Sequence, residues 1–421
     1  MSFFKVDPRL QNAADETLEQ CREVLADIDA VTEYNQQKVL AAFIENNVSE
    51  SHFAATTGYG YGDRGREVME QVFAQVMGAE DALVRHSILC GTHAIGIALF
   101  GILRPNDLLM AVTGTPYDTL LGVIGAEKES AGSLAEHGVR YREVALQEDG
   151  FPNLGAIRRA LQEEPSVKMI HIQRSRGYNL RPSLSVKQIG EIIAVVREVH
   201  PDSIVFVDNC YGEFVEKIEP TAVGADLMAG SLIKNPGGGI AENGGYICGR
   251  RDLVELCSYR LSTPGLGREV GASLGHNRTL FMGLFNAPHV VGEAVKTAVF
   301  AAALMEHFGF YCSPKWNESR ADIIQAIQLK TPEALIAFCQ GIQKGAPVDA
   351  FVTPEPWDMP GYDNQVIMAA GAFTMGSSIE LSADAPLREP FAVYMQGGLN
   401  FHTGKIGVLL AAQTMLERGL L

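Results

Sequence analysis

The chain has 421 residues, of which 47% are hydrophobic and 20% charged, as in a soluble globular protein long enough for more than one domain. Its net charge of −16, from 34 basic and 50 acidic residues, argues against a nucleic-acid-binding or membrane-surface protein. We find no secretory signal or membrane span, and seven cysteines without a Cys-x-x-Cys pair. We therefore expect a cytoplasmic protein with reduced thiols and no metal site.

The N-terminal part, from about Pro8 to Asn47, carries apolar side chains at helical spacing and is predicted to form helices. It is followed by Thr56-Thr-Gly-Tyr-Gly-Tyr-Gly-Asp-Arg-Gly-Arg-Glu67. Alternating glycine and tyrosine do not suit a regular helix, so we predict an irregular loop. Tyr61 and Arg64 could bind a phosphate there, since a planar guanidinium matches phosphate oxygens, but a flexible surface turn is an equal alternative.

A regular alternation of strands and helices begins near residue 81. The predicted strands are 81–85, 107–113, 139–144, 167–172, 204–207 and 227–233, and the predicted helices are 67–77, 90–99, 157–161 and 189–200. This rhythm predicts an α/β fold with a mostly parallel sheet and helices on both faces. A further short strand, 244–249, is expected to run antiparallel.

Two places in this region suggest ligand contacts. Cys90-Gly-Thr opens an apolar helix, and the amides of Gly91 and Thr92 could bind an anion there, although many helices begin this way. Tyr117 follows the strand 107–113, so its ring could cover a flat cofactor, or it could simply cap a helix.

An acid and an amine follow two successive buried strands. Asp208 ends the run Ile204–Val207, and Lys234 ends the run Leu227–Ile233. The carboxyl ends of parallel strands are where ligands bind in open α/β sheets. Pyridoxal phosphate requires a lysine that bonds to its aldehyde and a carboxylate that keeps its ring nitrogen protonated. The alternative is a helix cap and a solvated loop lysine, which we would prefer for either residue alone.

The C-terminal part begins with a long, mostly apolar run, 286–308, predicted to be a helix that leads to a second domain. Prolines then punctuate the chain, and we predict a helix opening at Lys330, a strand at 379–382 and a last helix at 403–418. The expected parts are an N-terminal helical segment (1–55), a large α/β domain (56–290) and a smaller α+β domain (291–421).

Four motifs together resemble a fold-type-I pyridoxal phosphate enzyme of the cystathionine lyase and methionine γ-lyase superfamily. They are Tyr59-Gly-Tyr-Gly-Asp-Arg-Gly-Arg-Glu67, Val207-Asp-Asn-Cys-Tyr-Gly-Glu-Phe214, Gly230-Ser-Leu-Ile-Lys-Asn-Pro-Gly-Gly238 and Val393-Tyr-Met-Gln-Gly-Gly-Leu399. The likeness covers nearly the whole chain and is greatest to the branch called the aluminium-resistance or methionine γ-lyase-like family. It implies a seven-stranded sheet in the large domain.

The resemblance also implies roles, position by position. Lys234 matches the lysine that bonds to the cofactor, Asp208 the partner of its ring nitrogen, and Tyr117 the tyrosine that stacks on its ring. The phosphate contacts that it implies are Gly91, Thr92 and Ser231 within the chain, and Tyr61 and Arg64 lent by a neighbouring subunit. The last pair implies a homo-oligomer, a dimer or a tetramer, with active sites shared between subunits.

This sequence departs from the superfamily's pattern in three places. The loop tyrosine and arginine are separated by two residues rather than one, and Ile233 stands where a hydroxyl residue usually precedes the lysine. Tyr394 occupies the usual place of the arginine that binds the substrate carboxylate. Arg388 or Arg176 are our candidates for that role.

The resulting hypothesis is a lyase that cleaves a carbon–sulfur bond in an amino acid such as cystathionine, cystine or methionine. Lys234 would remove the α-proton, and Tyr117 could assist protonation of the leaving group. Whether elimination occurs at the β or γ carbon stays open. The alternatives are an aldolase, a desulfurase using Cys257 or Cys312, and a non-catalytic protein of the same fold.

Overall fold

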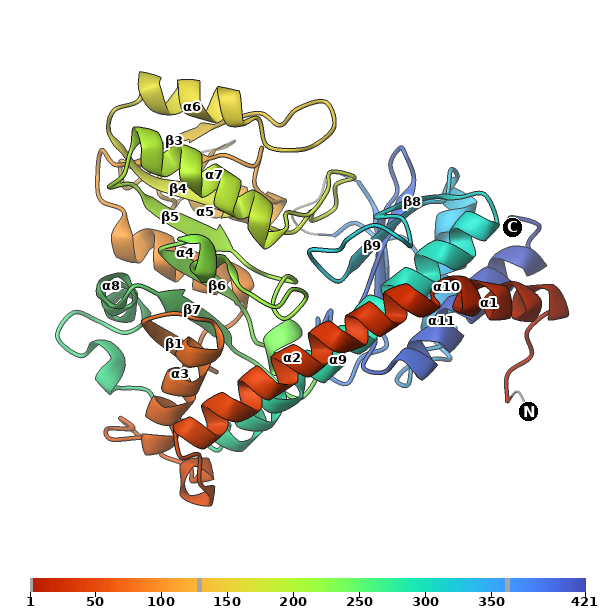
Figure 1. Ribbon diagram of the computed structural model, residues 1–421, viewed down its shortest axis with the longest axis horizontal. Coiled ribbons are helices and arrows are strands. Elements are labelled where there is room, and N and C mark those ends of the chain that lie inside the picture. The colour runs from red at the N-terminus through yellow and green to blue at the C-terminus, as the bar shows by residue number, and fades with distance from the viewer. Residues whose placement is uncertain (1–2, 127–130, 360–363) are drawn as a thin grey trace. The chain divides into compact units, whose positions relative to one another are not determined.

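The computed structural model describes residues 3–126, 131–359 and 364–421 (Figure 1). The chain forms two compact units. The large unit is Asn35–Asn286, and the small unit combines Met1–Tyr34 with Ala287–Leu421. The chain passes from one unit to the other within α2 (Arg22–Glu45) and again within α9 (Asn277–His307). The three-part domain division given above stays a prediction.

The large unit contains the predicted seven-stranded sheet, in the order β1-β7-β6-β5-β4-β2-β3. The strands are β1 (Asp81–Arg85), β2 (Leu108–Ala111), β3 (Arg140–Glu143), β4 (Val167–Gln173), β5 (Ile204–Asp208), β6 (Leu227–Ser231) and β7 (Gly245–Gly249). Strands β2 to β6 pair in parallel, and β7 runs antiparallel to both β1 and β6. Both the parallel sheet and the antiparallel strand are therefore confirmed.

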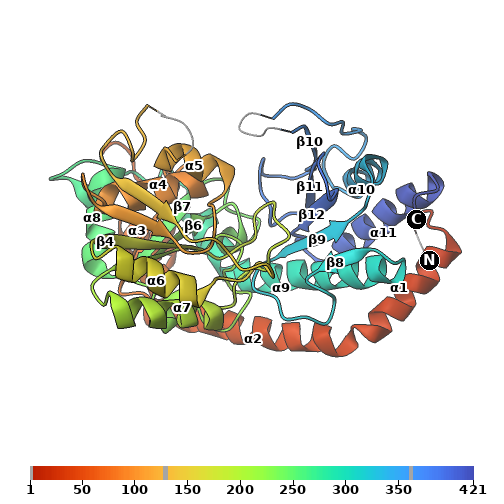
Figure 2. The same cartoon turned by 90° about the horizontal axis from the view of Figure 1, so that it is seen from above.

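Helices cover both faces of this sheet, with α4 and α5 on one face and α6 and α7 on the other (Figure 2). The helices are α3 (Arg64–Val76), α4 (Gly91–Ile102), α5 (Asp118–Ile124), α6 (Leu154–Glu163), α7 (Val186–Val199) and α8 (Arg251–Leu261). Ile95 and Leu99 of α4 belong to one buried cluster with Phe206 of β5. Because both faces are covered, every residue of β5 is buried, which explains its continuous apolar run.

Two boundaries in the large unit differ from the sequence-based expectation. Helix α3 begins at Arg64, three residues earlier than predicted, because the Asp63 side chain caps it by accepting a hydrogen bond from the Arg66 amide. Strand β6 ends at Ser231 rather than continuing to Ile233. Lys234 therefore lies in the loop beyond the strand, immediately before a 3-10 turn, Asn235–Gly237.

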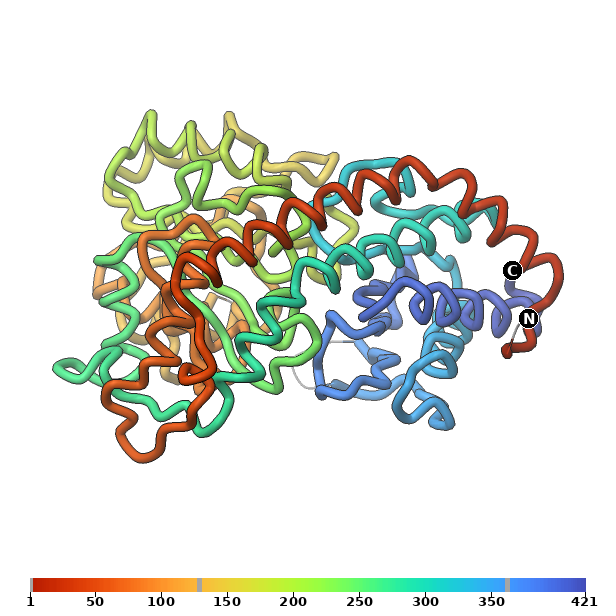
Figure 3. The backbone as a smooth tube through the Cα atoms, turned by 60° about the horizontal axis from the view of Figure 1, so that its bottom comes forward, coloured from red at the N-terminus to blue at the C-terminus, as the bar shows by residue number. Residues whose placement is uncertain are grey.

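The small unit has a five-stranded antiparallel sheet in the order β10-β11-β12-β9-β8. Its elements are α1 (Pro8–Gln20), β8 (Tyr311–Ser313), β9 (Ile324–Gln328), α10 (Pro332–Lys344), β10 (Val366–Ala369), β11 (Ser382–Pro386), β12 (Ala392–Gln396) and α11 (Phe401–Glu417). Helix α1 lies beside α11, where the Asp7 amide donates to Gln413 Oε1 over 2.8 Å (Figure 3). Leu10 and Ala14 share the core of this unit with Phe338.

The strand predicted at 379–382 is wrong, since the strand runs from Ser382 to Pro386. The sequence Ser-Ala-Asp-Ala-Pro contains none of the β-branched or aromatic residues that favour strands. It is extended because it pairs with β10 on one side and β12 on the other, so tertiary pairing overrides local preference.

Three further properties bear on function. No helix in the described part of the chain is long and apolar enough to cross a membrane. All seven cysteines are free, and only Cys90 is exposed. Among the described residues, no cluster of His, Cys, Asp or Glu could hold a metal ion.

Candidate active site

Asp208 and Lys234 lie on the carboxyl side of neighbouring strands, β5 and β6. Asp208 is 4% exposed, and its Oδ1 accepts a hydrogen bond from the Cys210 amide over 3.2 Å. Burial raises the pKa of Asp208, against the opposing effects of Lys234 and of the Cys210 amide. A buried carboxyl group of this kind is stabilised in its charged form by a cationic partner.

The amine of Lys234 lies over the ring of Tyr211, with Nζ 3.9 Å from the ring centroid. Burial by itself would lower the pKa of this amine, but Cys210, Tyr211 and Asp208 together raise it above its ordinary value. Lys234 is therefore held as an ammonium group when no other group reacts with it.

Tyr117 is the residue immediately before α5, and its hydroxyl lies 3.0 Å from Thr92 Oγ1. Its backbone amide donates to Gln173 Oε1 at the end of β4 over 3.1 Å. Burial, reinforced by Asp208, raises the pKa of Tyr117, so the side chain is a neutral phenol at neutral pH. The structure thus brings together Thr92 and Tyr117, two predicted residues that are 25 positions apart.

The start of α4 and the end of β6 form a second part of the site. A Cβ built on Gly91 would lie 3.0 Å from Cys210 Sγ and 3.5 Å from Ser231 Cβ, so glycine permits this close approach. The Ser231 hydroxyl is buried and has no hydrogen-bond partner in the part of the chain that the structure describes. A buried hydroxyl without a partner is costly, and an anion at the α4 N-terminus would supply one.

Tyr61 and Arg64, in contrast, are exposed, Tyr61 by 58%. Tyr61 stacks on Tyr59, with 5.5 Å between ring centroids. The loop itself is held by Arg66, a buried residue to which the sequence gave us no role. The guanidinium of Arg66 donates to the carbonyl oxygens of three residues: Gly60 (2.9 Å), Gly271 (2.7 Å) and Glu269 (3.3 Å).

The two candidates for a substrate-binding arginine have different surroundings. Arg176, in the loop after β4, is 1% exposed, and its backbone amide donates to Ser183 Oγ over 3.2 Å. Arg388 is exposed on the hairpin between β11 and β12 of the small unit. Both assignments stay predictions.

Several buried polar residues near Lys234 were missed in the sequence. Asn235 donates from Nδ2 to the carbonyl oxygens of Tyr211 (2.9 Å) and Glu213 (3.0 Å). Glu213 is fully buried and accepts a hydrogen bond from the Tyr246 hydroxyl over 2.7 Å. Burial raises the pKa of Glu213 to about 8. Asn235 and Glu213 could have been found from the two motifs 207–214 and 230–238, because these contain polar residues beside segments predicted to be buried.

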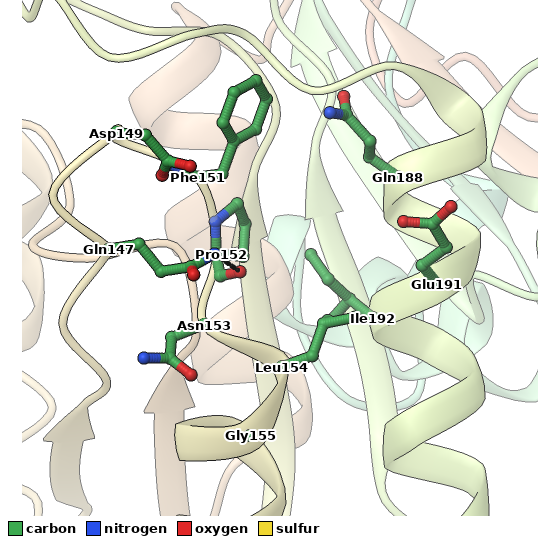
Figure 4. Close-up of a pocket in the computed structure, with 10 residues that line it drawn as sticks. All are labelled: Gln147, Asp149, Phe151, Pro152, Asn153, Leu154, Gly155, Gln188, Glu191 and Ile192. Atoms are coloured by element: carbon green, nitrogen blue, oxygen red, sulfur yellow. Dashed lines mark hydrogen bonds between the residues drawn. The ribbon is translucent and has the colours of Figure 1, made fainter.

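A surface hollow of about 480 Å³ lies elsewhere in the large unit, between the loop 147–155 and α7 (Figure 4). Its polar side chains serve local structure. Asn153 caps α6, Gln188 takes part in the cap of α7, and Gln147 donates to the Pro152 carbonyl. None of the predicted site residues lines this hollow, so we do not assign the chemistry to it.

Comparisons with known proteins identify the family of the chain. A family model described as methionine gamma-lyase matches residues 10–416. The uncharacterised protein YnbB of Bacillus subtilis (strain 168) is 49% identical over 395 residues, which cover 94% of this chain and 93% of YnbB.

Solved structures add the fold. A protein from Clostridium novyi NT, described as a carbon-sulfur lyase involved in aluminium resistance, has a TM-score of 0.94 and 50% identity, covering 97% of this chain and 96% of its own. A structure from Clostridium acetobutylicum, provisionally named a cystathionine beta-lyase involved in aluminium resistance, has a TM-score of 0.95 and 50% identity, covering 98% and 96%. The pyridoxal-5'-phosphate-dependent protein YhfS of Escherichia coli, at 16% identity, TM-score 0.61 and coverage of 93% and 97%, shares the fold. Because the family model matches nearly the whole chain, the chain belongs to the methionine gamma-lyase family.

Proposed function

We propose that the protein is a pyridoxal-phosphate-dependent carbon–sulfur lyase. Its substrate would be a sulfur-containing amino acid of the cystathionine, cystine or methionine type, cleaved by α-proton removal and β- or γ-elimination. The observation that carries the proposal is the placement of Lys234 and Asp208 at the ends of adjacent parallel strands. Membership of the methionine gamma-lyase family and the description of the Clostridium novyi protein support it.

The residues present fit the cofactor. Asp208 is buried, with a raised pKa, where a protonated ring nitrogen would be its partner. The Ser231 hydroxyl, partnerless among the described residues, would donate to the phosphate together with the amides of Gly91 and Thr92. Tyr117 would cover the ring. When bound, pyridoxal phosphate supplies an electron sink for the charge that forms at the substrate α-carbon.

The chain's own side chains then move and hold protons. Lys234 would take the α-proton at Nζ. Asp208 would hold the cofactor by its ring nitrogen and favour the protonated form of that nitrogen. Tyr117, a neutral phenol hydrogen-bonded to Thr92, holds a proton that it can donate toward the departing sulfur. Arg388 or Arg176 would hold the substrate carboxylate.

We also propose that the protein is a homo-oligomer, a dimer or a tetramer, in which Tyr61 and Arg64 reach the phosphate in a neighbouring copy. Both side chains are exposed, Tyr61 on the loop and Arg64 at the first residue of α3, and Arg66 holds the loop through the Gly60 carbonyl, which supports this role. Mixing Lys234→Ala and Arg64→Ala proteins tests it. Redistribution of subunits at equal amounts should restore about a quarter of the wild-type activity, because half of the dimers are mixed and each has one intact site. No recovery after verified subunit exchange would contradict the shared site.

Product analysis decides the type of reaction. Purified protein should absorb near the violet edge of the visible range, and borohydride reduction should attach the cofactor to the Lys234 peptide. Thiol, ammonia and ketoacid from a sulfur amino acid support the lyase. Alanine with persulfide would indicate a desulfurase, and aldehyde with a shortened amino acid would indicate an aldolase. No product from any amino acid would favour a non-catalytic protein.

The desulfurase alternative has little structural support. Cys257 is buried inside α8, and burial raises its pKa to about 12. Cys312 is buried in β8 of the small unit, and burial also raises its pKa. A desulfurase needs an accessible thiolate, which neither residue provides.

A further inference from the structure

The segment that follows β5 carries a side chain for which the proposed chemistry has no role. Tyr211 lies three residues after Asp208, and Lys234 Nζ is 3.9 Å from the centroid of its ring. That distance is well within the range at which an ammonium group is attracted to an aromatic face. Because the contact is partly shielded from water, the attraction is stronger than at an exposed site.

The backbone at this position is unusual. Tyr211 has a φ of +73°, in the left-handed region that bulky residues rarely adopt and that glycine adopts freely. Such a conformation persists where surrounding contacts enforce it, and it is concentrated at functional sites. Here the enforcing contact is Asn235, which binds the Tyr211 carbonyl over 2.9 Å and is adjacent to Lys234 in sequence.

The lysine and the tyrosine are thus connected through the Tyr211 side chain, by its ring and its hydroxyl, and through Asn235. The Asn235 side chain also holds the Glu213 carbonyl over 3.0 Å, so the whole turn 211–213 is fixed relative to the start of the lysine loop. A tyrosine at a position that favours glycine, locked by the neighbour of the reactive lysine, points to a use for the side chain.

We propose that Tyr211 is a positioning residue that holds the Lys234 amine over its ring face and stabilises that amine in its protonated form. Its consequence for catalysis rests on the proposed function: a lysine that has taken the α-proton becomes the cation that the ring favours. Tyr211 would then favour proton uptake by Lys234 and hold the resulting ammonium in place. The electrostatic claim itself applies to the chain without cofactor.

Other groups act on the same amine and have to be separated from Tyr211. Burial raises the pKa of the Cys210 thiol and of the Tyr117 phenol, so both are neutral near pH 7. The titratable groups that interact electrostatically with Lys234 besides Tyr211 are Asp208, Cys210, Glu213 and Tyr117. All four remain in the variants below, so a change in the amine's pKa reports on the Tyr211 side chain, and Tyr211→Phe separates its ring from its hydroxyl.

The test measures the pKa of Lys234 in the full chain freed of cofactor. Trace acetic anhydride is added between pH 7 and 12, and acetylation of the Lys234 peptide is quantified by mass spectrometry against exposed Lys187. Removing the ring with Tyr211→Leu should lower the midpoint by about 0.7 pH units, since a cation–π contact contributes about 1 kcal/mol. Acetylation of Lys234 at pH 8 should then rise about fivefold. Tyr211→Phe keeps the ring but removes the hydroxyl that also bonds to the amine, so its midpoint should lie between those of wild type and Tyr211→Leu. A midpoint equal to that of Tyr211→Leu would assign the effect to the hydroxyl and overturn the proposal.

A variant that relieves the backbone keeps the test informative. Tyr211→Gly suits a φ of +73°, so it should fold at least as well as wild type while showing the midpoint shift of Tyr211→Leu. An unchanged midpoint in both ring-deleted variants would overturn the proposal. A faster acetylation rate at high pH with an unchanged midpoint would also overturn the proposal. The ring would then shield the amine from the reagent without changing its pKa. Failure of the cofactor to bond to Lys234 would defeat the proposed function and leave this result standing.

Discussion

Two regions of the large unit carry the residues assigned to the cofactor, and they are built in opposite ways. Around Lys234, polar groups are buried and some lack partners among the described residues, notably the Ser231 hydroxyl and Glu213 Oε2. In the segment 56–66, Tyr61 and Arg64 form an exposed tip. The base of the segment is the buried Arg66, whose two terminal nitrogens donate to three carbonyl oxygens while its Nε has no partner among the described residues. The buried polar groups around Lys234 suit a small ligand that binds inside the protein. The exposed Tyr61 and Arg64 suit contact with a molecule outside the chain, such as a second copy of it.

The largest expected effect is at the buried region. Lys234→Ala should reduce lyase turnover by on the order of 10³-fold or more and abolish borohydride attachment, because the group that bonds to the cofactor and moves the proton is lost. The fold should survive, since removing one charged side chain relieves its burial. Lys187→Ala, an exposed change in α7, is the control. Full activity in Lys234→Ala would contradict the assignment of the site.

The pH dependence of the unfolding free energy tests whether Glu213, in the buried region, is protonated in the folded protein. Burial raises the pKa of Glu213 from 4.5 to about 8, so the folded chain binds a proton that the unfolded chain releases in that interval. Stability from this group is therefore complete below about pH 4.5 and is lost as pH rises to about 8. Glu213→Gln should remove a pH-dependent change on the order of 3–5 kcal/mol in unfolding free energy between pH 5 and 8.

Denaturant unfolding at the two pH values measures this difference, with exposed Glu191→Gln as the matched control. Equal pH dependence in wild type and Glu213→Gln would mean that Glu213 is ionised in the fold. The buried region would then contain more charge than we infer.

Replacing the buried Arg66 should lower the stability of the protein more than replacing the exposed Arg64. Arg66→Ala leaves three carbonyl oxygens without their donor and should lower the unfolding free energy by about 2–3 kcal/mol. Arg64→Ala, two residues away and exposed, is the natural control and should change stability by less than about 0.5 kcal/mol. Similar losses in the two variants would remove the distinction between a fixed base and a free tip.

Arg64→Ala, which should change stability least, should still weaken cofactor binding. Arg64→Ala should weaken cofactor binding about tenfold, the loss expected for one charge-assisted contact to a phosphate. Fluorescence titration of the cofactor measures it, and Arg64→Lys should recover part of the affinity because it keeps the charge without the planar guanidinium. Unchanged affinity in Arg64→Ala would assign the exposed tip to another partner.

The large unit was predictable because most of its strands are buried on both faces; the edge strand β3, which is partly exposed, was recognised by its alternation instead. β5 reads as a short apolar run, and its last residue is Asp208. In the small unit, β11 was placed wrongly because it carries small and polar residues that are extended only through their neighbours. The roles of Arg66 and Asn235 depend on carbonyl groups distant in sequence, 205 and 24 positions away at their furthest, which no local pattern displays.

The small unit combines Met1–Tyr34 with Ala287–Leu421, and this separation in sequence affects when its parts can fold. Leu10, Ala13 and Ala14 of α1 belong to a core completed by residues of α10 and α11. At roughly 5–20 residues per second, the ribosome needs on the order of 10–50 s to make the intervening large unit. The buried face of α1 therefore stays uncovered for at least this time, until the residues of α10 and α11 that pack against it have been made.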